Sequence, residues 1–165
     1  MNPLRMLSAA AIAALAAAAA ISGARPAMAE PGEIRLSPAL LELLRAEMRE
    51  VTAGVQVIAA SLATANWDAV HDAAANVRAS YIMEKSLTPE QSRELGQALP
   101  ESFRELDAEF HERALKLALA AEAHDAELAG FHYARLLDSC TRCHARFAGA
   151  RFPGFGAPAA QEHRH

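Results

Sequence analysis

Apolar residues recur every three to four positions along four long stretches of this chain, which is the spacing of a helix with one buried side. The first stretch begins at Ser37-Pro38, where the serine can cap a helix and the proline suits its first position. It fades at residues 63–66. Its apolar side consists of Leu41, Leu44, Met48, Val51, Val55, Ile58 and Leu62. The charged residues that fall mostly off that side are Arg45, Glu47, Arg49 and Glu50.

Three further stretches show the same spacing. A second helix, capped by Asn66, is predicted with the apolar residues Trp67, Val70, Ala74, Val77 and Tyr81. A third, from about Pro100, carries Phe103, Leu106, Phe110, Ala114, Leu117 and Ala121. A fourth is predicted from about Asp125 to about Ala148. Its side chains that share one side are Tyr133, Leu136, Leu137, Cys140, Cys143, His144 and Phe147.

The connection between the second and third helices predicts a short extra helix. Thr88 precedes a proline, and Gln91 stands three residues later, which together make a capping box. Gly96 and Pro100 are expected to end this insert, which occupies residues 86–99. Four amphipathic helices joined by short connections predict an all-α fold, an antiparallel four-helix bundle.

The N-terminus has the pattern of a cleaved secretory signal over residues 1–29. Arg5 gives a positive start, residues 6–21 form an uncharged, alanine-rich apolar run, and Ala27-Met28-Ala29 matches a cleavage site. A membrane anchor is the alternative, but the run is short for a span and leads directly into the cleavage pattern. We therefore expect cleavage before Glu30 and export to a bacterial periplasm.

Export changes the charge of the chain. The full sequence has 16 basic and 20 acidic side chains; the signal removes Arg5 and Arg25 and no acid, which leaves 14 against 20. An acidic protein is a poor candidate for binding nucleic acid. No carboxylate pair or nucleophile–base set stands out, so we do not expect an enzyme. The mature chain suits one bundle domain over residues 30–155, followed by a flexible tail over 156–165.

The strongest chemical signal is the run Cys140-Thr141-Arg142-Cys143-His144, which contains both cysteines of the chain. C-x-x-C-H is the attachment pattern of a c-type haem, with two thioether bonds from the cysteines and the histidine as iron ligand. On a helix these three side chains project from one side. A thioredoxin-like pair would need a βαβ pattern, and a zinc site would need more ligands. A disulfide is disfavoured between helical residues three apart.

With its haem motif near the end of an all-helical chain, the protein resembles the cytochrome c′ family. The resemblance covers about residues 37–152 and is carried by Leu44-Arg45-Ala46-Glu47-Met48, by Asn66-Trp67-Asp68 and by Cys140 to Phe147. It implies one covalent haem c per chain, held by Cys140 and Cys143, with His144 as the proximal iron ligand.

The resemblance also gives roles to two residues of the first helix. In low-spin relatives a methionine at about the position of Met48 ligates the iron, whereas in high-spin members a residue there only covers the sixth site. Met48 is thus a candidate sixth ligand, with a core packing residue as the alternative. Arg45 is a candidate contact for a haem propionate.

The function implied by the resemblance is single-electron transfer between redox partner proteins. The alternative is binding of a small gas, nitric oxide or carbon monoxide, at an open sixth site. Many gas-binding members carry a basic residue four positions after the haem histidine, where this chain has Ala148. That difference favours electron transfer. Relatives often dimerise through their first two helices, so a homodimer is also expected.

Overall fold

The computed structural model describes residues 34–155, and within that range all regular structure is helical, which confirms the all-α fold class. The expected signal and the flexible tail lie outside the described residues. The elements are α1 (Pro38–Ala63), α2 (Trp67–Arg78), α3 (Met83–Ser86), α4 (Pro89–Ala98), α5 (Glu101–Glu122), α6 (Ala126–Phe147) and a single 3₁₀ turn (Pro153–Phe155).

Local capping chemistry sets where the long helices begin. The side chains of Ser37, Asn66 and Asp125 each accept a hydrogen bond from a backbone N–H in the first turn of α1, α2 and α6. Thr88 and Gln91 form the predicted capping box at the start of α4. These bonds satisfy N–H groups that have no partner inside a helix. The predicted helix starts are therefore confirmed.

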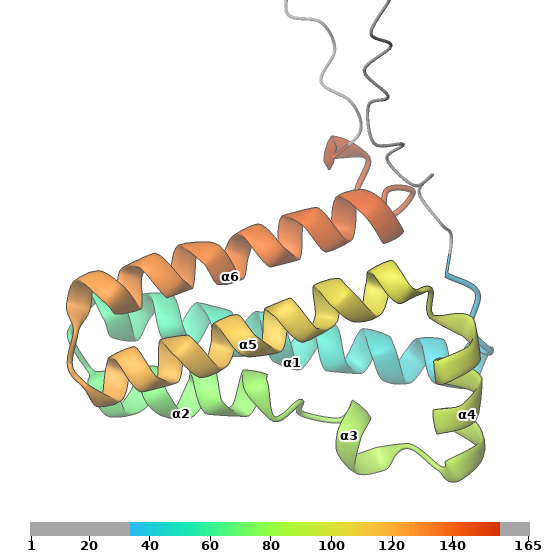
Figure 1. Ribbon diagram of the computed structural model, residues 1–165, viewed down its shortest axis with the longest axis horizontal. Helices are drawn as coiled ribbons and strands as arrows, with labels where there is room; N and C mark the ends of the chain where they lie inside the picture. Colours follow the sequence, from blue (N-terminus) through green and yellow to red (C-terminus); the bar gives the residue numbers. More distant parts are fainter. Residues whose placement is uncertain (1–33, 156–165) are drawn as a thin grey trace, which may run out of the picture.

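The four long helices pack side by side into a bundle (Figure 1). α5 packs extensively against α2 and α6, and α1 packs mainly against α2. The core is formed by aliphatic side chains and many alanines, and its largest members from all four helices are Ile58, Val70, Val77, Leu117 and Leu136. Alanine allows close approach of the helix backbones, so a small core excludes water with few large side chains.

Two short helices lie between α2 and α5, where one was predicted, and α3 almost entirely precedes the predicted insert. The one-turn α3 precedes α4, and α4 continues through Gly96 to end at Ala98, directly before Leu99 and Pro100. Glu94 of α4 accepts hydrogen bonds from the backbone N–H (2.7 Å) and hydroxyl (3.0 Å) of Ser37. The insert is thereby fastened to the residue that caps α1.

The sequence pattern predicted that Glu47 lies mostly off the apolar side of the first helix, and this prediction is wrong. Its side chain is buried, with the residue only 4% exposed. The carboxylate accepts hydrogen bonds from the backbone N–H groups of Tyr81, Ile82 and Met83, at the corner between α2 and α3. Burial raises the pKa of Glu47, but together the hydrogen bonds from these N–H groups lower it by more than burial raises it. The pKa of Glu47 therefore lies below its usual value.

Gly54 lets Tyr81 approach α1 closely, because a Cβ at this position would overlap the Tyr81 hydroxyl. Glycine to alanine in a helix normally stabilises a protein by about 0.5–1 kcal/mol. We expect Gly54→Ala to destabilise by about 1–3 kcal/mol instead, because the ring must move out of a packed position. Gly130→Ala in α6 is the matched control, since no atom lies near its Cβ position. Thermal unfolding of both variants is the measurement, and stabilisation by both would contradict the expected clash.

Candidate functional site

Cys140, Cys143 and His144 of the C-x-x-C-H motif lie in the last two turns of α6, and all three are partly buried. α6 contacts α1 sparingly, and one such contact is the Tyr133 hydroxyl, which donates to the carbonyl of Val55 at 3.4 Å. Figure 1 shows α1 and α6 running in opposite directions. Cys140 lies two turns after Tyr133, and Met48 lies two turns before Val55. By this spacing Met48 lies at about the same level along the bundle as Cys140.

Both thiols are free and protonated at neutral pH. Burial raises the pKa of Cys143 to about 11, with the nearby Asp107 carboxylate as a second cause. Burial also raises the pKa of Cys140, whose Sγ donates to the Leu136 carbonyl at 3.5 Å. The two cysteines do not form a disulfide. Thioether formation needs free thiols, so their state suits haem attachment.

The raised pKa of Cys143 predicts slow alkylation of this thiol in protein made without haem. The thiolate is the reactive form, and its fraction at pH 8 is about 100-fold lower for a pKa of about 11 than for an ordinary value of about 9. The rate with iodoacetamide, followed by mass spectrometry of the peptide, should rise as the pH approaches 11. Unfolding in urea should restore ordinary reactivity. A fast, pH-independent reaction in the folded protein would contradict the burial of this thiol.

The His144 imidazole has the properties of a neutral ligand. Burial lowers its pKa, so the ring is uncharged at neutral pH. Phe152 stacks on it, with ring centroids 4.6 Å apart and an interplanar angle of 26°, and Phe155 lies at 6.1 Å. Phe152 reaches this position because its N–H donates to the Ala148 carbonyl, which turns the chain back beyond α6. Sequence reasoning missed Phe152; the available signal was the aromatic spacing in Arg151-Phe152-Pro153-Gly154-Phe155.

The two candidate residues of α1 are less enclosed than the motif. Met48 is 40% exposed, although its neighbours Glu47 and Val51 are buried. The Arg45 guanidinium pairs with the Glu42 carboxylate at 2.6 Å on the surface. Arg45 would have to leave this partner, or share it, to contact a propionate. Surface pairs of this kind contribute little energy, so such an exchange is inexpensive.

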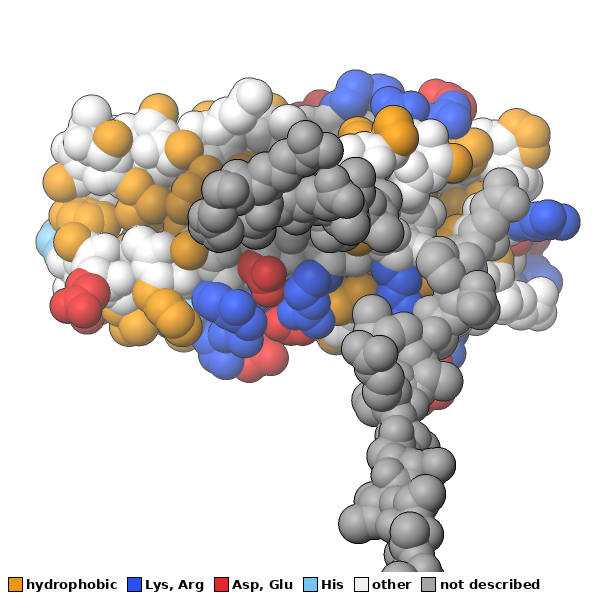
Figure 2. Space-filling model, turned by 90° about the horizontal axis from the view of Figure 1, so that it is seen from above, with side chains coloured by type: hydrophobic (Ala, Val, Ile, Leu, Met, Phe, Trp, Pro, Cys, Tyr) orange, Lys and Arg blue, Asp and Glu red, His pale blue; other side chains and the backbone are white. Residues whose placement is uncertain are grey.

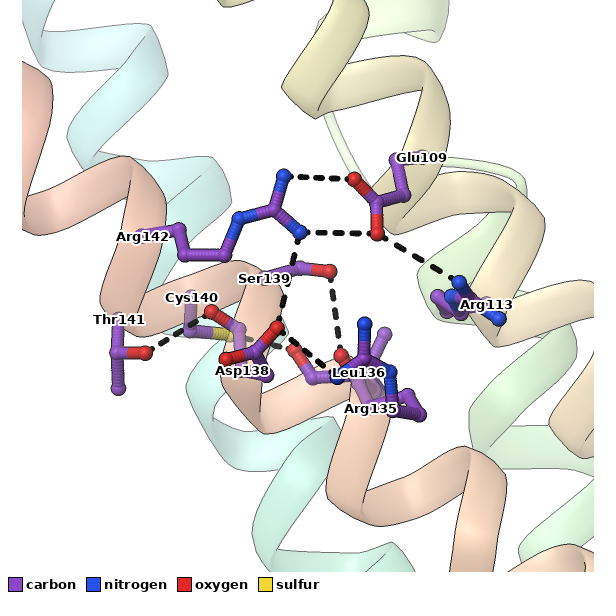
Figure 3. A network of polar contacts seen from close by, with 9 residues as sticks. All are labelled: Glu109, Arg113, Arg135, Leu136, Asp138, Ser139, Cys140, Thr141 and Arg142. Atoms are coloured by element: carbon purple, nitrogen blue, oxygen red, sulfur yellow. Dashed lines mark hydrogen bonds and ion pairs between the residues drawn. The ribbon is translucent and has the colours of Figure 1, made fainter. Parts of the chain in front are cut away.

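A charged network joins the motif to α5 (Figure 3). Arg142, inside the motif, donates two hydrogen bonds to Glu109 at 2.9 and 2.8 Å, and this contact holds the pKa of Glu109 below its usual value. Asp138 contacts both Arg142 and Arg135, and Arg113 contacts Glu109. A paired guanidinium and carboxylate fix a relative orientation. The network therefore holds the motif end of α6 against α5.

The face seen from above carries both signs of charge. Figure 2 shows basic and acidic side chains interspersed along the lower edge, with apolar side chains gathered on the left part of the view. Mixed charge gives weaker long-range steering than a patch of one sign.

Comparison of the chain with protein-family models, curated proteins and solved structures finds no match. Over residues 34–155, no group of three or more histidine, cysteine and acidic side chains is arranged to hold a metal ion. In the same range, none of the helices combines the length and the apolar character required to cross a bilayer.

Proposed function

We propose that this chain is an exported monohaem c-type cytochrome that carries single electrons. The observation that carries the proposal is one set of three side chains on α6. Cys140 and Cys143 are free, protonated thiols, and His144 is a neutral imidazole, all partly buried in a C-x-x-C-H pattern. This donor set fits a haem.

The chain's own residues hold and orient the group. Cys140 and Cys143 would hold the haem by thioether bonds, each thiol adding across a vinyl group with its hydrogen retained and no net oxidation. The Phe152 ring restrains the imidazole plane through its stacking contact. The Arg142–Glu109 pair fixes the helix that carries all three residues. The bound haem supplies a reversible one-electron couple, whose potential depends on the axial ligands and on burial.

A second candidate function is reversible binding of a small gas, nitric oxide or carbon monoxide. The observation in its favour is the 40% exposure of Met48, since a side chain that is not packed into the core can move aside. Electron transfer remains the first proposal, because Ala148 stands where many gas-binding members of the cytochrome c′ family carry a basic residue.

The visible spectrum of the mature protein, exported by a host that attaches haem, tests both proposals. A red chromophore that stays with the chain under denaturing conditions supports the cytochrome, and a colourless protein rejects it. A low-spin spectrum that does not respond to carbon monoxide supports electron transfer with a six-coordinate iron. A high-spin spectrum that shifts with carbon monoxide puts gas binding first.

A further inference from the structure

Glu47 precedes Met48 in α1, and its carboxylate accepts several hydrogen bonds from the backbone of another part of the chain. Its Oε1 accepts from the N–H of Tyr81 at 2.9 Å, and its Oε2 accepts from the N–H groups of Ile82 and Met83 at 2.6 and 3.0 Å. These donors lie 34 to 36 residues away in the chain. We call this set the Glu47 clamp. It fastens one side of α1 to the corner that leads into α3.

The clamp is stronger than the local structure requires. α3 is a single turn of four residues and buries no residue of its own. Burial of a carboxylate has a large desolvation cost, which only several hydrogen bonds offset. Charged hydrogen bonds are about twice as strong as neutral ones, and here three converge on one group. Stabilising the single turn of α3 does not account for a buried carboxylate with three hydrogen bonds.

The clamp bears on the direction in which Met48 points. Successive residues of a helix are separated by about 100° around its axis, so fixing Glu47 toward the α2–α3 corner fixes Met48 on the neighbouring side of α1. A rotation of α1 by about 10° moves an atom about 5 Å from the axis by about 1 Å. Positioning of a functional group needs precision of about 0.5 Å. Loss of the clamp would therefore change what Met48 covers.

We propose that Glu47 is a positioning residue that holds α1 in rotation, and thereby sets the direction of the Met48 thioether toward the haem that Cys140, Cys143 and His144 would hold. This inference rests on the proposed haem function and on the place of Met48 at about the level of Cys140 along the bundle. It applies whether Met48 ligates the iron or only covers the sixth site, because both cases need the same direction of the side chain.

Glu47→Gln tests the proposal, with Glu50→Gln as the matched control. The amide places an NH₂ against backbone donors and leaves one acceptor for three N–H groups. Glu50 is exposed on the same helix and takes no part in the clamp. The measurement is carbon monoxide association with the ferrous holo-protein. We expect a rate about tenfold higher for Glu47→Gln, the size of one lost charged hydrogen bond, and no change for Glu50→Gln.

A variant cycle separates positioning from general stability. In a Met48→Ala background, Glu47→Gln should have no further effect on carbon monoxide association, because the side chain through which it acts is gone. An equal effect with and without Met48 would overturn the proposal, as would a Glu47→Gln rate equal to that of the parent.

Where Glu47→Gln does not fold, Glu47→Asp is measured instead: it keeps the charge but is one methylene shorter, and its rate must lie above the parent's. A colourless parent rejects the haem proposal, whereas a red parent with unchanged variant kinetics rejects only this inference.

Discussion

The double variant Cys140→Ser/Cys143→Ser is expected to lose the covalent chromophore completely. Serine hydroxyls do not form thioethers with the vinyl groups, and the chain has no other cysteine to replace them. Each single variant retains one thiol and so keeps at most one thioether bond. The measurement is haem staining of the protein on a denaturing gel, together with the mass of the intact chain. This is the largest change that a pair of substitutions can make to the proposed protein.

Thr141→Ser is the matched control inside the motif. Thr141 is exposed, and its hydroxyl donates to the Asp138 carbonyl at 2.9 Å, a bond that serine retains. The control should stain like the parent. The double variant should also unfold at a lower temperature, because a group that binds only the native state stabilises that state. A red double variant under denaturing conditions, or a colourless control, would contradict haem attachment through these two sulfurs.

Residues 34–155 show how far local sequence patterns reach. The caps at Ser37, Asn66 and Thr88 were predicted, as was a helix start near Asp125, because capping depends on neighbours within one turn. The fold class followed from helical periodicity and short connections for the same reason. The motif residues were placed on one helix side because their spacing alone determines it.

What the sequence did not predict depends on residues far apart in the chain. Glu47 looked like a surface residue because its three partners lie on another element, and only the packing of the α2–α3 corner brings them together. Phe152 reaches His144 only because the chain reverses after α6. The Arg142–Glu109 pair likewise spans 33 residues. The direction of Met48 belongs to this class, since it depends on the rotation of α1.

The second large effect is expected for Met48→Ala. If the thioether ligates the iron, its removal should convert a low-spin spectrum to a high-spin one, lower the reduction potential and allow carbon monoxide to bind. Methionine ligation raises the potential of a haem, so the direction of the change follows from the loss of that ligand. Visible spectra of the ferric and ferrous forms, with and without carbon monoxide, and a redox titration are the measurements.

Met83→Ala is the control for Met48→Ala, because Met83 is the other methionine within residues 34–155. It begins α3, and its N–H is one of the three that bind Glu47, a contact made by the backbone and kept in alanine. Met83→Ala should therefore keep the parent spectrum. A parent-like spectrum for Met48→Ala would contradict ligation by Met48. If Met83→Ala alone loses the low-spin state, the second methionine is the ligand. If both variants keep a high-spin parent spectrum, the sixth site is open and gas binding becomes the better proposal.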